Sequence, residues 1–234
     1  MIDGLARAML EGDRNGDGPA KGGDRRREIR GMESTGGDPT DERAFVAALQ
    51  AGERVAFERL VREHGARMLA VARRMVRDEA TAQDCLQDAF LSVHRAIGRF
   101  EPTGSLGGWL HRITVNACLM RLRANKRLAE TSIDELLPAF DPDGIRLGEP
   151  RTEIRNPEDA LEAARIRVYM RQKIDELPDG YRIVLLLRDI EGYSTREAAE
   201  MVGVAEGALK VRLHRARAAL KTLVEPLWDE LGTA

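Results

Sequence analysis

Residues 194–221, STREAAEMVGVAEGALKVRLHRARAALK, carry the pattern that decides the fold of the C-terminal part of the chain. Ser194 and Glu197 form the S-x-x-E pair of a capping box, which predicts that a helix begins there. Gly203 stands where this helix must turn into the next, and glycine tolerates the backbone angles that such a turn requires. We therefore expect two consecutive helices, at about 195–202 and 205–224, joined by a tight turn.

The second of these helices has two contrasting faces. Its apolar stripe, which we expect to be buried, consists of Leu209, Leu213, Ala216 and Leu220. The opposite face is cationic and has small residues near its N-terminus; it comprises Gly207, Ala208, Lys210, Val211, His214, Arg215 and Ala218. A helix of this kind can enter the major groove of DNA closely. The pattern indicates a DNA-binding helix-turn-helix, with a solvated basic surface that has no DNA role as the alternative.

The overall charge does not by itself indicate a nucleic-acid partner, because the formal net charge is only -2. The distribution is more informative. Residues 205–224 contain one acid, Glu206, and five basic residues, which are Lys210, Arg212, Arg215, Arg217 and Lys221. A nearly neutral chain therefore contains a local basic patch, which contact with DNA phosphates requires.

Helical periodicity also extends through residues 41–127. We expect helices at about 42–51, 53–77, 79–98 and 106–127, with the loop FEPTGS at 100–105. The expected apolar stripe of the third helix is Leu86, Phe90, Val93 and Ile97, and that of the fourth is Leu106, Leu110, Ile113, Ala117 and Met120. Four such helices can enclose one small core.

The remaining segments complete the predicted organisation. Residues 1–40 are rich in Gly, Asp and Arg, and we expect this extension to be disordered. Residues 128–156 are acidic and punctuated by Pro and Gly, which is typical of a flexible linker. Its apolar residues Leu136, Leu137, Phe140 and Ile145 are expected to dock when a partner is present. With further helices at 158–176 and 179–191, the prediction is an all-α chain: two small helical domains, 41–127 and 157–234, joined by that linker.

Several classes of function are disfavoured. The chain has no HExxH, no GxSxG and no glycine-rich phosphate loop, and its histidines lack ligand spacing, so we expect neither an enzyme nor a metal or cofactor site. Cys85 and Cys118 fall within helical patterns and are expected to be small buried hydrophobes; a disulfide or redox switch is the alternative. No apolar run approaches the roughly 20 residues of a membrane span, and no secretory signal is evident. The expectation is a soluble cytoplasmic protein without membrane insertion.

Two parts of the chain resemble extracytoplasmic-function (ECF) sigma factors of bacterial RNA polymerase. Residues 60–100, LVREHGARMLAVARRMVRDEATAQDCLQDAFLSVHRAIGRF, and 104–127, GSLGGWLHRITVNACLMRLRANKR, look like sigma region 2. Residues 177–220, LPDGYRIVLLLRDIEGYSTREAAEMVGVAEGALKVRLHRARAAL, look like region 4. The resemblance covers about 53–127 and 160–224, and both blocks occur in the family's order.

This resemblance implies a sigma factor that binds core RNA polymerase, recognises the minus-ten and minus-thirty-five promoter elements, and promotes DNA opening. It also implies regulation by an anti-sigma factor. The alternative function is a stand-alone helix-turn-helix regulator. Such a regulator needs a sensory or receiver domain, and residues 41–127 show no alternation of strands and helices that would supply one.

The resemblance assigns roles to particular residues. Those matching the family's polymerase-binding positions are Asp84, Gln87 and Asp88, and Leu91 lies on the same helix face. In the fourth helix, Trp109, Arg112, Asn116 and Arg123 fall on one side, a combination that suits unstacked bases and phosphates; core packing is the alternative for Trp109. By resemblance, the loop from Phe100 to Ser105, including Thr103, captures flipped bases, and Lys126 and Arg127 contact phosphate.

Minus-thirty-five recognition is expected from Lys210, Val211, Arg212, His214 and Arg215. The chain departs from the family here, because hydroxyl residues are common at the positions of Ala205, Ala208 and Val211. An alanine at position 205 cannot cap the recognition helix, and such a loss typically costs on the order of 1 kcal/mol.

Overall fold

The computed structural model describes residues 39–101, 104–125, 132–137 and 160–231, and every regular element within these ranges is helical. The predicted all-α fold is therefore confirmed. The described residues belong to two compact units, which divide between Lys126 and Arg127. The predicted extension up to residue 38 lies outside the described residues, as does most of the predicted linker, including Phe140 and Ile145.

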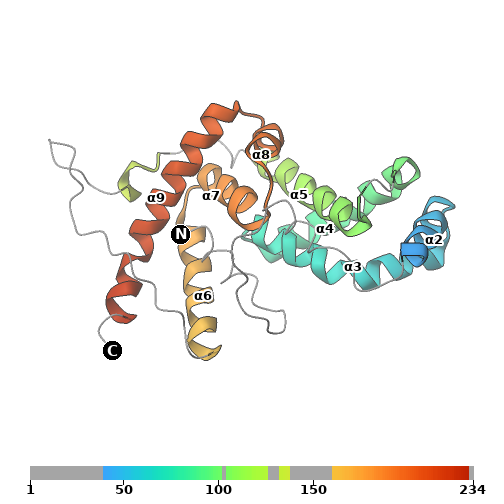
Figure 1. The fold of residues 1–234 in the computed structure, drawn as a ribbon, viewed down its shortest axis with the longest axis horizontal. Coiled ribbons are helices and arrows are strands. Elements are labelled where there is room, and N and C mark those ends of the chain that lie inside the picture. Colours follow the sequence, from blue (N-terminus) through green and yellow to red (C-terminus); the bar gives the residue numbers. More distant parts are fainter. Residues whose placement is uncertain (1–38, 102–103, 126–131, 138–159, 232–234) are drawn as a thin grey trace. The chain divides into compact units, whose positions relative to one another are not determined.

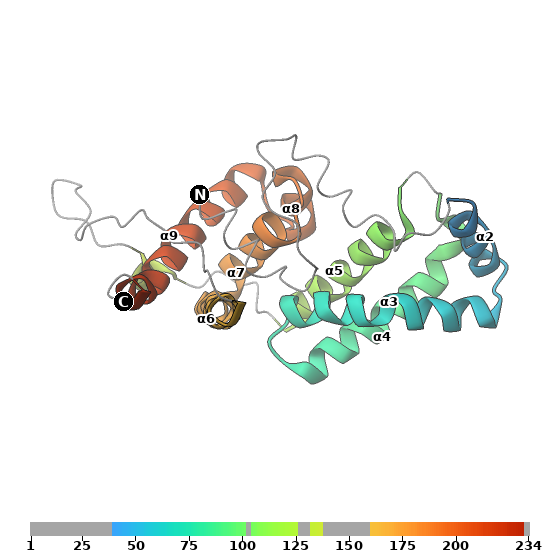
Figure 2. The same ribbon diagram turned by 60° about the horizontal axis from the view of Figure 1, so that its bottom comes forward.

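The first unit is built from α2 (Pro39–Gln50), α3 (Arg54–Met75), α4 (Glu79–Ala96) and α5 (Leu106–Ala124). A short 3-10 helix, η2 (Ile97–Arg99), extends α4. Helices α3, α4 and α5 pack against one another, and α2 lies at one end of them, against α3 and η2 (Figures 1 and 2).

Side-chain caps begin two of these helices. The Asp78 carboxylate accepts a hydrogen bond from the Thr81 backbone N–H at 2.7 Å, at the start of α4. At the start of α5, the Ser105 hydroxyl accepts from the Gly108 N–H at 3.2 Å. Both caps pair a backbone donor that the helix itself leaves unpaired. Local sequence therefore determines where α4 and α5 begin.

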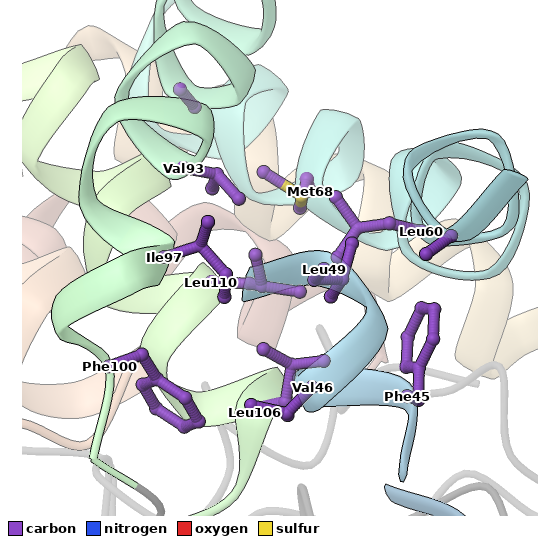
Figure 3. Close-up of a cluster of buried hydrophobic side chains, with 12 residues drawn as sticks. Phe45, Val46, Leu49, Leu60, Met68, Val93, Ile97, Phe100, Leu106 and Leu110 are labelled. Carbon is purple, nitrogen blue, oxygen red and sulfur yellow. The ribbon is translucent and has the colours of Figure 1, made fainter. Parts of the chain in front are cut away.

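The core of the first unit draws on each of its helices (Figure 3). The side chains that point into the cluster shown are Phe45, Val46, Leu49, Leu60, Met68, Val93, Ile97, Phe100, Leu106 and Leu110. Helix α2 contributes Val46 and Leu49 beside Ile97 and Leu110. Apolar packing therefore ties α2 to the segment between α4 and α5.

The apolar stripe expected for α5 is confirmed at its first two positions, Leu106 and Leu110, and is wrong at Met120. Met120 is 68% exposed, and Ile113 and Ala117 are only partly buried. The buried face also includes Thr114, Val115, Cys118, Leu119 and Leu122, whose mean direction is about 150° around the helix from the predicted stripe. Because α5 packs against both α3 and α4, its buried face is wide, and the predicted stripe follows only one edge of it.

In the predicted stripe of α4, Val93 and Ile97 are buried as expected, and small neighbouring residues explain why Leu86 and Phe90 are not fully buried. The fully buried positions include Ala82, Cys85 and Ala89, whereas the larger Leu86 and Phe90 are only partly buried. Cys85 and Cys118 are both buried and unoxidised, as expected. The Cys118 thiol hydrogen-bonds to Cys85 and, with Arg121 nearby, lowers the pKa of Cys85 against the opposing effect of burial.

The second unit contains α6 (Ala160–Glu176), α7 (Asp179–Leu185), α8 (Thr195–Val202) and α9 (Glu206–Leu231). A π-helical turn, η4 (Leu186–Ile190), extends α7, and a short 3-10 helix, η3 (Asp134–Leu136), precedes them in the chain. Helix α9 is the organising element, because α6, α7, α8 and η3 all contact it. The segment predicted as one helix at 179–191 is thus an α-helix followed by a π-turn.

The predicted helix-turn-helix is confirmed in its local geometry. Ser194 and Glu197 form both hydrogen bonds of the capping box, at 3.2 and 2.9 Å. Gly203 ends α8 with φ +79°, a left-handed conformation that other residues adopt only with strain. The predicted stripe of α9 is buried in full: Leu209, Leu213, Ala216 and Leu220.

Candidate polymerase and promoter interfaces

An acidic surface runs along α4, on the side away from the core. It consists of Asp84, Gln87, Asp88 and Leu91, all of them exposed. Helical spacing places these four residues on one face, because α4 is regular from its Asp78 cap onward. Leu91 is 53% exposed between polar neighbours. The structure therefore brings together all four residues that were predicted to bind polymerase.

Arg121 of α5 is an additional part of this surface that the sequence did not reveal. Its Nη2 lies 3.0 Å from Asp84 Oδ2 and 3.9 Å from Asp88 Oδ2. Such partly exposed pairs contribute little to stability, about 0–1 kcal/mol. Their effect here is on the surface itself, because Arg121 orients two carboxylates and neutralises part of their charge. Only the packing of α4 on α5 reveals this contact.

A second surface lies at the start of α5. Trp109 is half-buried, and its ring lies 4.9 Å from the Phe100 ring, centroid to centroid, with the planes tilted by 46°. Arg112, Asn116 and Arg123 are exposed along the same helix. Trp109 is thus partly a packing residue and partly accessible, and its contact with DNA bases stays a prediction.

Phe100 occupies a different position from the one predicted for a base contact. Its side chain belongs to the core and is only 8% exposed. Phe100 therefore packs against the Trp109 ring and exposes little surface of its own. Ser105 caps α5 and remains partly exposed. Thr103, Lys126 and Arg127 lie outside the described residues.

A third surface is formed by α9. Lys210, Val211 and His214 are exposed, and Arg212 and Arg215 are partly exposed. All five residues predicted to contact the minus-thirty-five element are therefore accessible on α9. Four of them belong to the face away from the buried leucines, and Arg212 lies at the edge of the buried stripe. Arg215 also forms an ion pair with Asp134, from the segment 132–137 that precedes the second unit's helices.

One basic residue of the predicted patch has an internal role. Arg217 forms a two-pronged ion pair with Asp189 of η4, with Nε–Oδ2 at 2.9 Å and Nη2–Oδ1 at 2.6 Å. The Asp189 side chain is only 6% exposed. A paired and hydrogen-bonded carboxylate is the form in which a buried charge is tolerated. The pair joins α9 to the turn before α8, so Arg217 positions the recognition helix.

A buried arginine connects the other end of α7 to α6. The Arg182 side chain is almost fully buried, and its guanidinium nitrogens lie 3.4 Å from Asp179 Oδ1 and 3.5 Å from Asp175 Oδ1. Such a pair specifies how the connected helices meet more than it adds to stability.

Among the described helices, none is both long and apolar enough to cross a membrane.

Comparison with known proteins identifies the family of the chain. Residues 60–128 match the family model "Sigma-70 region 2", and residues 167–220 match "Sigma-70, region 4". The chain is 38% identical over 180 residues to the ECF RNA polymerase sigma factor SigM of Mycobacterium tuberculosis, which covers 77% of this chain and 83% of SigM. It is 31% identical over 189 residues to the RNA polymerase sigma-H factor of Pseudomonas aeruginosa, which covers 81% of this chain and 96% of that relative.

Solved structures give similar matches. One is the structure of CnrH in complex with the cytosolic domain of CnrY, with 27% identity and a TM-score of 0.44 over 79% of this chain and 97% of that chain. Both sigma regions are present in order, and the SigM relative covers most of the chain. The chain therefore belongs to the extracytoplasmic-function sigma factors, non-enzymatic proteins that bind core RNA polymerase and promoter DNA to initiate transcription.

Proposed function

We propose that each of the three surfaces has a separate role in transcription initiation and that particular residues carry each role. The α4 surface of Asp84, Gln87, Asp88 and Leu91 binds core polymerase. The start of α5, with the loop before it, binds the melted minus-ten element. The exposed side of α9 binds the minus-thirty-five element. The observation that carries the assignment is the α5 surface, where a partly accessible tryptophan lies near exposed Arg112 and Asn116, with Arg123 farther along the helix.

The chemistry of the α5 surface favours single-stranded DNA. A half-buried indole offers one face for stacking with an unpaired base, and stacking of this kind is worth about 1–3 kcal/mol per base. Phe100 packs against the tryptophan and limits its motion. Arg112 and Arg123 supply charge for the phosphates that follow, and Asn116 supplies both a donor and an acceptor.

The composition of the α4 surface favours a protein partner. Leu91 provides an apolar centre, and the carboxylates of Asp84 and Asp88 provide a polar rim. Interfaces commonly combine an apolar centre with a charged rim. The partner at this surface is expected to be basic, because Arg121 neutralises only part of the negative charge.

For the α9 surface, the proposal is that Arg215 and Lys210 contribute most of the affinity. Arginine contacts to guanine edges and lysine contacts to phosphate are the common modes of major-groove binding. Val211 is exposed and apolar, so its expected contact is with a thymine methyl group. His214 adds a further polar contact on the same side.

We also propose that the chain acts in the cytoplasm, where core polymerase is found, and that an anti-sigma factor controls it, as is common in this family. A test is to add the product of a neighbouring gene to the transcription reaction. Specific inhibition of this sigma factor would support the proposal. Unimpaired transcription in the presence of every neighbouring product would contradict it.

The proposed function is tested by in vitro transcription with purified core polymerase on a library of genomic fragments. The expected result is promoter-specific transcripts that depend on the added chain. The strongest promoter recovered then provides defined probes for each surface. Specific DNA binding without core polymerase, and with no effect on initiation, would instead favour a stand-alone regulator.

A charge reversal, Asp84→Arg, tests the polymerase surface. It replaces a carboxylate with a second guanidinium beside Arg121, so affinity for core polymerase should fall by about tenfold or more. The fold should persist because Asp84 is exposed. The matched control is Glu58→Arg on α3, an equally exposed carboxylate. Equal affinity of both folded variants for core polymerase would refute the assignment.

A further inference from the structure

Helix α2 lies outside the residues that match sigma region 2, yet it reaches both ends of the loop between α4 and α5. The Gln50 amide donates two hydrogen bonds, to Ile97 O at 3.2 Å and to Phe100 O at 3.0 Å. At the other end of the loop, the Glu42 carboxylate accepts a hydrogen bond from the Leu106 N–H at 2.8 Å. These contacts join residues 47 to 64 positions apart in the chain.

The chemistry of each contact matches the helix end that it meets. Gln50 supplies an N–H donor to the carbonyl of Phe100, which follows η2, and a second donor to the Ile97 carbonyl, which also accepts from the Phe100 N–H at 3.0 Å. The first N–H groups of a helix lack partners within it, and Glu42 supplies an acceptor to Leu106 at the start of α5. A carboxylate at this position is further favoured by the helix dipole.

The spacing of the two side chains makes α2 a rigid spacer. Glu42 and Gln50 are eight residues apart, which is about 12 Å along a helix axis. Between them, Val46 and Leu49 pack into the core beside Ile97 and Leu106 (Figure 3). Polar contacts at both ends and apolar contacts between them therefore set the separation of Phe100 and Leu106.

Helix α2 is itself anchored to α3. Arg59 of α3 forms an ion pair with Asp41, Nη2 to Oδ2 at 3.3 Å. The Arg59 guanidinium also lies 4.4 Å from the centre of the Phe45 ring. Arg59 thus attaches α2 to α3, and the contacts of Glu42 and Gln50 attach it to the segment between α4 and α5. A displacement of α2 would therefore break contacts with both.

We propose that Glu42 and Gln50 are positioning residues for promoter opening. They set the distance between Phe100 and Leu106, and with it the position of Trp109, whose ring packs at a tilt of 46° against that of Phe100. The proposal rests on the function assigned above to the α5 surface. It adds a role for a helix whose residues do not themselves touch DNA.

The test measures binding of a single-stranded minus-ten oligonucleotide to the holoenzyme, by fluorescence anisotropy. The oligonucleotide is taken from the strongest promoter recovered in the transcription selection. Gln50→Met keeps the length and helix propensity of the side chain but removes its donor. It should weaken oligonucleotide binding by about fivefold to tenfold, which is about the net effect of one ordinary hydrogen bond. Affinity for core polymerase and for minus-thirty-five duplex should not change.

Matched variants separate positioning from general stability. Gln172→Met makes the same substitution at an exposed position of α6 and should bind the oligonucleotide normally. Glu42→Ala should weaken binding, whereas Glu42→Gln, which retains an acceptor oxygen, should restore most of it. Glu58→Ala serves as the control for the loss of an exposed carboxylate.

Two results would overturn the proposal. One is normal oligonucleotide binding by Gln50→Met. The other is a parallel loss of core affinity and melting temperature, which would assign Gln50 to general stability alone. Failure of the proposed function is distinguishable, because Trp109→Ala would then bind the oligonucleotide as well as wild type does.

Discussion

The two promoter-binding surfaces are positioned in different ways. At the α5 surface, the loop ends are bonded by Glu42 and Gln50 of a helix about 50 residues earlier in the chain. At the α9 surface, the main determinants are local: the capping box of Ser194 and Glu197, and the left-handed Gly203. Two long-range ion pairs of α9, Arg217 with Asp189 and Arg215 with Asp134, add to them.

The difference follows from what each surface must present. A recognition helix keeps its shape through its own backbone hydrogen bonds. The rest of the fold therefore has only to orient it. A loop between two helices has unpaired backbone groups at both ends and no internal ladder of hydrogen bonds. Its shape therefore depends on side chains supplied from elsewhere in the fold.

The largest expected effect is on the stability of the second unit. Arg217→Ala leaves the buried Asp189 carboxylate without its partner, so the free energy of unfolding should fall by about 3 kcal/mol or more. The measurement is chemical denaturation followed by circular dichroism. Arg196→Ala, at an exposed pair with Glu200, is the control and should change little. Equal stability of both variants would show that local signals alone orient α9.

A smaller effect is expected on DNA binding. Arg215→Ala should weaken binding of the holoenzyme to a minus-thirty-five duplex by about 1–3 kcal/mol if Arg215 reads a base edge. Its binding to the single-stranded minus-ten oligonucleotide should remain normal, which would separate the two surfaces functionally. Unchanged affinity for the duplex would remove Arg215 from the recognition surface.

A stabilising substitution tests the missing cap of α9. Ala205 precedes the first residue of α9, and its carbonyl accepts from the Leu209 N–H at 3.0 Å, but its side chain has no acceptor. Ala205→Ser should raise the free energy of unfolding of the second unit by about 1 kcal/mol. Ala208→Ser, within the first turn, is the control and should give no gain. The absence of a gain at position 205 would mean that the cap is supplied in another way.

The smallest effect is expected at the ion pair between Asp134 and Arg215. Asp134→Asn removes a competitor for the Arg215 guanidinium and should strengthen duplex binding by no more than about fivefold, most clearly at low salt. Glu135→Gln changes the net charge equally at a neighbouring exposed residue and is the control. An identical effect of both variants would indicate only a general change in charge.

Sequence patterns predicted the second unit more accurately than the first. Leu209, Leu213, Ala216 and Leu220 are large or regularly spaced apolar residues on one helix, and their burial follows from periodicity. In α4 and α5, the most buried positions include Ala82, Ala89 and Thr114. Small and hydroxyl residues are buried there because helices approach closely, and no property of one helix alone reveals which of its faces meets two neighbours.

The sequence by itself determined the all-helical fold, the helix-turn-helix with its cap and turn, the exposed face of α4 and the family. Each of these depends on residues within a few turns of one another, whose preferences are expressed locally. Only the tertiary structure decided that Arg217 is internal, that Arg121 completes the acidic surface, that Phe100 supports Trp109 and that α2 spans the loop ends. Those contacts join distant residues, and they form only when helix packing brings complementary groups together.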